Sequence, residues 1–140
     1  MTTIEVTFKG PFLTGDPSST LHQAVQAGVQ ELVELGEQRL DKMLRPRPAG
    51  VYLSVAEARR GRASKGHYRR NVRGYTRDLA GFITDGGKVV YGPWLEGVSP
   101  RNQATRFKGY ASFRRTGQWL QAQAQRVMDH HIRGWAERMG

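Results

Sequence analysis

The sequence predicts an α+β fold in which an antiparallel β-sheet meander packs against a long N-terminal helix and a C-terminal helix. One segment near each end repeats apolar residues at three- and four-residue steps, as amphipathic helices do. Short stretches that alternate apolar and polar residues, which are typical of half-buried strands, precede the first segment and lie between the two. The chain has 140 residues, the usual size of one domain, so we expect residues 1–140 to form a single α+β domain.

The N-terminal segment reads as a strand followed by a loop. Residues 3–8, TIEVTF, alternate so that three apolar side chains share one face, namely Ile4, Val6 and Phe8. A stretch rich in Gly, Pro and Ser follows. Ser18 or Ser19 can cap the next helix, because a side-chain oxygen accepts the unpaired N–H groups of a first turn.

The first helix is expected over residues 20–44. Its apolar stripe is interrupted only near Gly36, and the sequence RPRP at 45–48 ends it because proline cannot continue the hydrogen-bond ladder. The stripe that should face the core consists of Leu21, Val25, Val29, Leu32, Leu40 and Met43.

The middle of the chain is dominated by strand patterns. A short strand is expected at 51–55, and a basic loop at 59–66. Residues 67–91 contain three further β-like segments, HYRRNVRGY, RDLAGFITD and KVVYG. The sequence DGG at 85–87 is a hairpin signal, because glycine tolerates the positive φ that such turns require.

A turn at Pro93 should end the last strand, and an irregular basic loop is expected over about 98–112. The final helix is expected over residues 116–138. Its buried stripe should consist of Leu120, Ala124, Val127, Met128, His131 and Trp135.

The charge is high and uneven. The net charge is +10, and residues 1–44 carry six acids and three bases, whereas the remainder carries nineteen bases and six acids. Such asymmetry favours an acidic partner, either nucleic acid or an acidic protein face, with a role in solubility as the alternative. There are no cysteines, no apolar run long enough to span a membrane and no secretion signal in the first ten residues, so we expect no membrane partner.

Catalytic patterns are missing from the sequence. There is no Gly-x-Ser-x-Gly elbow and no phosphate-binding Gly-x-x-x-x-Gly-Lys-Ser/Thr loop. His130 and His131 are adjacent on a helix and so point about 100° apart, which prevents them from chelating one ion together. Glu96 has no acidic neighbour with which to share acid–base work. We therefore expect no enzyme activity, no metal and no cofactor.

Two basic stretches carry the strongest functional signal. Residues 59–77 contain eight Lys or Arg and no acid, and residues 101–126 contain six and no acid. A strand HYRRNVRG would place Arg69 and Arg73 on one face and Arg70 on the other. Because aromatic residues are interleaved, these stretches can contact DNA non-specifically; a subunit contact and a solvated face are the alternatives. No motif supports sequence-specific base recognition.

Two short motifs resemble a known family. KGHYRRNV at 65–72, two strands, VVYGPWLEG at 89–97, a basic segment and a C-terminal helix together resemble the tail-completion or neck proteins, which join head to tail in long-tailed bacteriophages. The residues that match are Gly66, Arg69 and Val72 in the first motif and Tyr91, Pro93, Glu96 and Gly97 in the second, with Trp94 as its aromatic. The chain departs from the family pattern at Lys65, at Val98 and by one residue missing between Glu96 and Gly97.

The resemblance implies a virion protein at the head–tail junction, which forms a homo-oligomeric ring between the connector on the portal side and the tail tube. DNA would pass through the ring, and a non-specific DNA contact there fits the basic surface. The related tail-terminator proteins share a similar build, so a tail-terminator ring remains an alternative, as does a basic nucleic-acid-binding accessory protein.

We expect the turn at 89–97 to dock against a partner rather than to react. Pro93 would fix the exit from the strand, Tyr91 and Trp94 would supply rigid apolar area, and Glu96 would pair with an arginine such as Arg101 or Arg106. The candidate interface residues are Arg69, Arg70, Arg73, Tyr91, Pro93, Trp94, Glu96, Arg101, Arg106, Lys108, Arg114 and Arg115.

Overall fold

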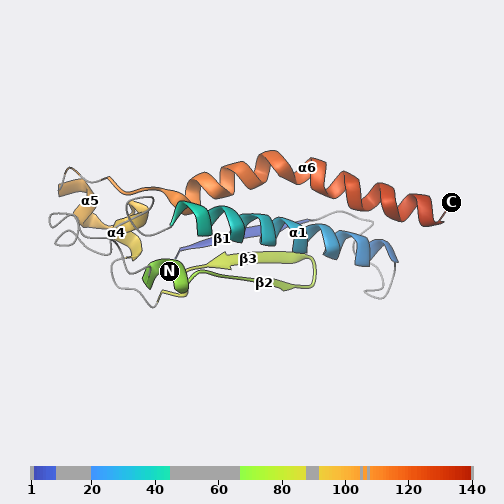
Figure 1. Ribbon diagram of the computed structural model, residues 1–140, viewed down its shortest axis with the longest axis horizontal. Coiled ribbons are helices and arrows are strands. Elements are labelled where there is room, and N and C mark those ends of the chain that lie inside the picture. Colours follow the sequence, from blue (N-terminus) through green and yellow to red (C-terminus); the bar gives the residue numbers. More distant parts are fainter. Residues whose placement is uncertain are drawn as a thin grey trace.

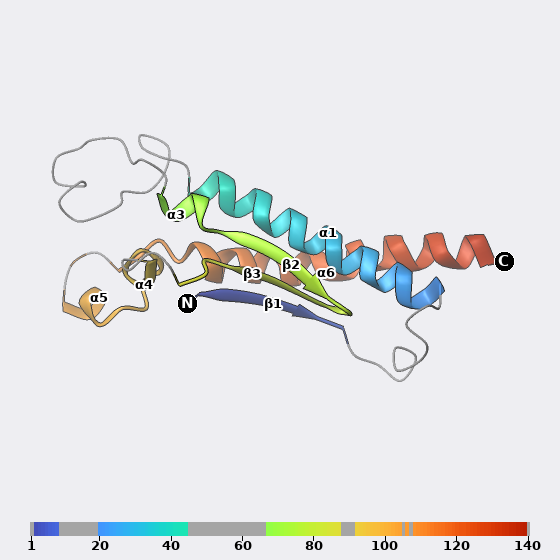
Figure 2. The ribbon, with the colours of Figure 1, turned by 90° about the horizontal axis from the view of Figure 1, so that it is seen from below.

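A computed structural model confirms the α+β class: two long helices pack on a three-stranded antiparallel sheet (Figures 1 and 2). No helix among the described residues is long and apolar enough to cross a bilayer. The structure describes residues 2–8, 20–44, 67–87, 92–104, 106 and 108–139. The strand expected at 51–55, the basic loop at 59–66, the strand KVV and Tyr91 lie outside these ranges.

The sheet has the strand order β1-β3-β2, with β1 at Thr3–Thr7, β2 at Arg73–Arg77 and β3 at Ala80–Thr84. The alternation expected at the N-terminus is confirmed, because the apolar residues of β1 pack against the core. A two-residue turn joins β2 to β3, and Asp78 adopts φ 52° there. The hairpin between β2 and β3 turns at Asp78. Both glycines of the DGG sequence have positive φ, and the strand expected after them lies outside the described residues.

The first long helix, α1, spans Thr20–Met43 and closely matches its expected range. Gly36, where the apolar stripe is interrupted, is buried against the sheet. A Cβ atom at this position would overlap the side chains of Ile83 and Leu120, so glycine allows α1, β3 and the last helix to approach one another closely. The gap in the stripe is therefore the point of tightest packing.

The last helix, α6, spans Ser112–Met139 and begins four residues earlier than expected. It runs antiparallel to α1, because Trp135 Nε1 donates to Thr20 Oγ1 (2.8 Å) at one end and the Thr116 hydroxyl contacts Met43 Sδ (3.4 Å) near the other. Both helices cover the same face of the sheet (Figures 1 and 2).

Three short helices replace segments for which strands or irregular structure were expected. They are α3 at His67–Arg70, α4 at Gly92–Glu96 and α5 at Pro100–Ala104. The expectation of strand at 67–70 is wrong: the chain makes one helical turn, closed by Asn71 N–H to Tyr68 O (3.0 Å), before β2 begins. The irregular loop expected from residue 98 is wrong in part, because α5 occupies its first half.

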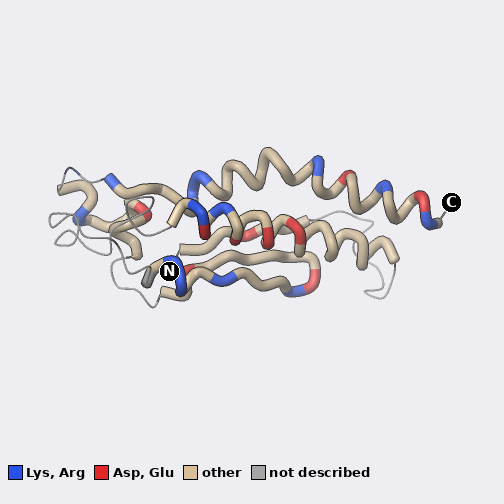
Figure 3. The backbone as a smooth tube through the Cα atoms, in the orientation of Figure 1, with Lys and Arg blue, Asp and Glu red and all other residues tan. Residues whose placement is uncertain are grey.

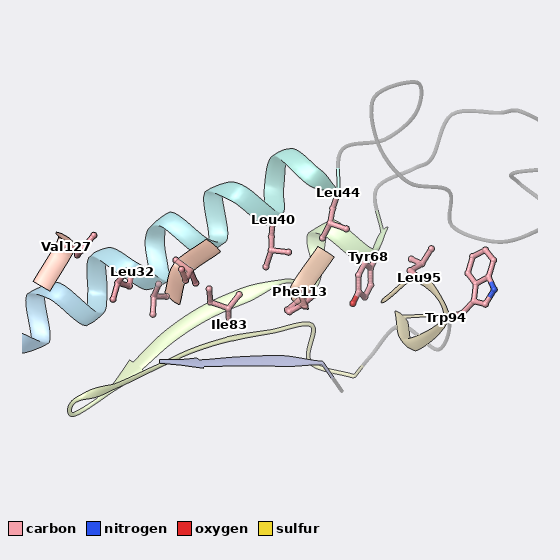
Figure 4. Close-up of a cluster of buried hydrophobic side chains, with 11 residues drawn as sticks. Leu32, Leu40, Leu44, Tyr68, Ile83, Trp94, Leu95, Phe113 and Val127 are labelled. Atoms are coloured by element: carbon pink, nitrogen blue, oxygen red, sulfur yellow. The ribbon is translucent and has the colours of Figure 1, made fainter. Parts of the chain in front are cut away.

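The main core follows the interface of α1, α6 and β3 and continues to the end of the molecule where α4 lies (Figure 4). Leu32, Leu40 and Ile83 occupy its centre, with no measurable exposure. Tyr68 and Leu95 extend it beyond the sheet. This packing anchors α3 and α4 to the two long helices.

Candidate functional site

The structure describes residues 92–97 of the turn that the sequence singles out, and these residues form a helical turn. Pro93 lies near the start of α4, where its missing N–H costs no helical hydrogen bond. Its carbonyl accepts from the N–H groups of Gly97 and Val98, both at 2.9 Å. The turn expected at Pro93 is therefore helical, and the strand expected before it lies outside the described residues.

Glu96 is buried, at 6% exposure, and caps the last helix. Its two carboxylate oxygens accept hydrogen bonds from the backbone N–H groups of Phe113 (2.8 Å) and Arg114 (3.1 Å). A negative charge here satisfies otherwise unpaired amides and complements the positive end of the helix dipole. The expected ion pair with Arg101 or Arg106 is replaced by these backbone contacts, and Glu96 serves the fold.

A tight backbone crossing holds Glu96 in this place. Gly97 (φ 101°) and Gly109 (φ 89°) lie so close that a Cβ atom on either would overlap the backbone of the other segment. Next to the crossing, Tyr110 N–H donates to Leu95 O (2.7 Å) and Ala111 N–H donates to Glu96 O (3.1 Å). Only glycine fits both conditions, left-handed φ and close approach.

A second buried acid, Asp85, lies where β3 ends. It accepts hydrogen bonds from the Tyr68 hydroxyl (2.8 Å), the Thr2 N–H (3.0 Å) and the Gly87 N–H (2.9 Å). Burial and the neighbouring Asp85 carboxylate raise the pKa of Tyr68 far above its usual value. Three donors satisfy this acid, which makes it a structural anchor between β1, α3 and β3.

The candidate aromatic Trp94 is also interior, with 8% of its surface exposed. It lies at one end of the main core beside Leu95 (Figure 4), and its carbonyl accepts from Asn102 Nδ2 (3.0 Å). The prediction that Trp94 offers exposed docking area is therefore wrong. The described part of the motif at 92–97 holds α4, α5 and α6 together instead of presenting a surface.

The candidate cations lie on the surface, but on several different elements of the structure. Arg69 and Arg70 belong to α3 and Arg73 to β2, so the expected single strand carrying all three does not exist. Arg69 forms a bidentate ion pair with Asp41 of α1, at 2.5 and 2.7 Å, and this contact raises the pKa of Arg69. The exposed candidates are Arg70, Arg73, Arg101, Arg106, Lys108, Arg114 and Arg115.

One of these exposed cations also supports the fold. The Lys108 ammonium donates to the carbonyl oxygens of Asn102 (2.8 Å) and Gln103 (3.4 Å) near the end of α5, where a positive charge is favoured. Figure 3 shows acidic residues gathered mainly on α1, and basic residues on β2, on α6 and around α5. The positive surface is therefore spread over several elements.

The histidines show no metal-binding arrangement in the described residues, where no three His, Asp or Glu side chains form a group that could hold an ion. His22 bonds Asp78 at the hairpin turn (2.7 Å), and His131 lies 3.6 Å from Glu31 across the two long helices. The sequence did not identify a partner for His22. His22 and Asp78 are 56 residues apart in sequence, and they meet because the turn between β2 and β3 lies beside the start of α1.

The edges of the two outer strands are a further candidate surface. β3 is central, so β1 and β2 each have one edge that pairs with no described strand. From the alternation of antiparallel bonds, the outward-facing backbone groups are those of Thr3, Glu5 and Thr7 on β1 and of Gly74 and Thr76 on β2. Such edges are ready contacts for another strand.

No family model, no curated protein and no solved structure matches the chain.

Proposed function

We propose that this protein is a structural subunit of the head–tail junction of a tailed bacteriophage, which joins copies of itself into a ring and has no catalytic role. The motifs at 65–72 and 89–97 and the α+β class support the phage assignment. The observation that carries the assembly role is that no described strand pairs with the outer edge of β1 or of β2.

These two edges are complementary. Both strands are five residues long, and because each is antiparallel to β3, they run parallel to each other. A neighbouring copy in the same orientation would add its β2 beside β1 and continue the sheet. Glu5 is the acid of the β1 edge, whereas Arg73 and Arg77 flank the β2 edge, so this contact also pairs opposite charges.

A contact of this kind is heterologous, because one surface of each copy meets a different surface of the next. Repeating this contact produces a closed ring when successive rotations from one copy to the next lead back to the first copy. A groove of about 350 Å³ runs along the β1 edge and is lined by Ile4, Val6, Gly117 and Leu120, among others. The side chains of Ile4 and Val6 are only half-buried, so a strand added beside β1 would cover more of their apolar surface.

The test blocks strand pairing at the β2 edge without changing a core residue. Thr76 is exposed, and its N–H faces away from β3, so Thr76→Pro deletes an outward donor, whereas Thr76→Val keeps the amide and serves as the matched control. We expect the wild-type protein and Thr76→Val to form rings by light scattering after gel filtration and by negative-stain microscopy. Thr76→Pro should remain monomeric with unchanged circular dichroism.

A charge exchange tests the same contact independently. Glu5→Arg should weaken assembly, as should Arg77→Glu, and the double variant Glu5→Arg/Arg77→Glu should restore it. Immunogold labelling of purified virions tests the location in the virion, and we expect label at the neck. Label at the far end of the tail tube, or no label on the virion, would contradict the proposed position at the head–tail junction. A monomer at every concentration contradicts the ring.

A further inference from the structure

We infer that the outer face of the sheet is a binding site for single-stranded nucleic acid, in which Tyr75 stacks with a base and Arg73 and Arg77 hold the flanking phosphates. This site shares Arg73 and Arg77 with the β2 edge of the proposed ring contact, whereas the rings of Tyr75 and Phe82 belong to the outer face alone. Arg73, Tyr75 and Arg77 belong to the basic stretch at 59–77, and in the structure they lie on the regular strand β2.

The aromatic part of this site is a stacked pair. The rings of Tyr75 and Phe82, which are partners in the register of β2 and β3, lie with centroids 5.0 Å apart and planes inclined by 19°. Phe82 is half-buried, but Tyr75 is 46% exposed, which is unusual for an aromatic side chain of this size. Phe82 fixes the orientation of the tyrosine ring and leaves part of it open for a further flat ring.

The cationic part of the site lies on the same strand. Arg73 and Arg77 are each two residues from Tyr75 and so point to the same face, about 7 Å on either side of it. Both are exposed, and neither forms an ion pair or hydrogen bond with another described residue. Arg69, by contrast, is already paired with Asp41.

The surroundings favour a polyanion. Both long helices pack on the opposite face, so no described helix covers this one (Figure 2). The strands place one acid on it, Glu5, two strands away from Tyr75 and in register with Phe82. Asp78, in the adjacent turn, is held by His22. The remaining neighbours are small, namely Thr3, Thr7, Ala80 and Thr84.

Single-stranded nucleic acid matches this arrangement better than a duplex. A flat, open aromatic surface between two arginines offers stacking to an unpaired base and charge to its backbone, without any pattern for reading base edges. A duplex keeps its bases stacked inside and would contact only the arginines. Binding should therefore be insensitive to base sequence, sensitive to salt and selective for unpaired strands.

Fluorescence anisotropy with a labelled oligo-dT of 15 nucleotides, and with a duplex of the same length, tests the inference. Tyr75→Thr keeps a strand-forming residue and removes the ring, so we expect oligo-dT affinity to fall about 5- to 150-fold. Tyr75→Phe should retain most of the affinity. Arg73→Gln and Arg77→Gln should each lower the slope of log affinity against log salt by about 0.7.

Arg133→Gln is the matched control, because it removes one exposed charge from α6, on the other side of the sheet. It should change oligo-dT binding less than either β2 arginine variant. Unchanged binding by Tyr75→Thr, equal affinity for the duplex, or no binding of oligo-dT at 50 mM salt each overturns the inference. Ring formation by Tyr75→Thr is measured in parallel: tyrosine-dependent binding without rings contradicts only the proposed function, and rings without such binding contradict only this inference.

Discussion

Buried acids organise the end of the molecule where α4 meets α6. Glu96 accepts the first amides of α6, and Asp85 accepts from Tyr68 and from two backbone N–H groups. A buried carboxylate is stable only when hydrogen bonds replace its lost hydration. All the Glu96 donors and two of the three Asp85 donors are distant in sequence, which ties the local turns to the global fold.

The role of Glu96 predicts a loss of stability rather than a loss of docking. In Glu96→Gln an amide replaces the carboxylate, so one of the two backbone donors loses its acceptor and the charge at the helix N-terminus disappears. We expect the free energy of unfolding to fall by about 1–3 kcal/mol in urea titrations. Glu137→Gln, an exposed change on the last turns of α6, should have an effect below about 0.5 kcal/mol. Equal midpoints for both variants would contradict the capping role.

The environment of Tyr68 predicts a specific dependence on alkaline pH. Burial and Asp85 raise the pKa of the folded tyrosine, whereas in the unfolded chain it ionises near pH 10. Above that pH the unfolded state releases a proton that the folded state retains, so stability falls as pH rises. The wild-type protein should lose up to about 1.4 kcal/mol per pH unit more than Tyr68→Phe does above pH 10. Parallel stability curves for the two proteins would contradict this.

At the scale of elements, the contact between α1, α6 and the sheet depends on small residues at the crossing points. Gly36 faces Ile83 and Leu120, and Gly74 and Gly81 allow the strands to approach Val33. A glycine in a helix lowers stability by about 1 kcal/mol relative to alanine. Close packing explains the glycine at Gly36, because the contact leaves no room for a Cβ atom. At Gly117 of α6 the structure shows no such constraint, because a Cβ atom would lie 3.9 Å from the nearest side-chain atom, on Ile4.

This difference predicts opposite effects for the same substitution in the two helices. Gly36→Ala should lower the free energy of unfolding by about 1–3 kcal/mol, because the gain in helix propensity is outweighed by overlap with two core side chains. Gly117→Ala should raise it by about 0.5–1 kcal/mol. Thermal and urea unfolding of both variants measure the effect, and stabilisation by Gly36→Ala would show that α1 is not closely packed there.

At the scale of the whole molecule, the sheet carries two kinds of surface, which share Arg73 and Arg77. Its edges carry opposite charges and backbone groups that pair with no described strand, which suits contact between copies. Its outer face carries the stacked pair of Tyr75 and Phe82 between two arginines, which suits nucleic acid. In a ring built through the edges, the outer faces of successive copies would form one continuous band. The two proposals are compatible, yet Thr76→Pro and Tyr75→Thr address them separately.

Local patterns in the sequence determine the long elements. The apolar stripe of α1, the alternation in β1 and the stripe of α6 each follow from spacing alone, because a long amphipathic segment has one way to bury its apolar side. The sequence also predicts a basic surface, and most of the named cations are exposed.

Only the tertiary structure decides what the short segments do. Glu96 reads as a surface acid among bases, but the crossing at Gly97 and Gly109 brings it under the first turn of α6. Trp94 reads as a docking aromatic, but it is buried beside Leu95. Tyr75 is a candidate for stacking with a base because β3 places Phe82 beside it. Short-range patterns carry no information on which distant groups will meet, and a short segment adopts the conformation that satisfies those long-range contacts.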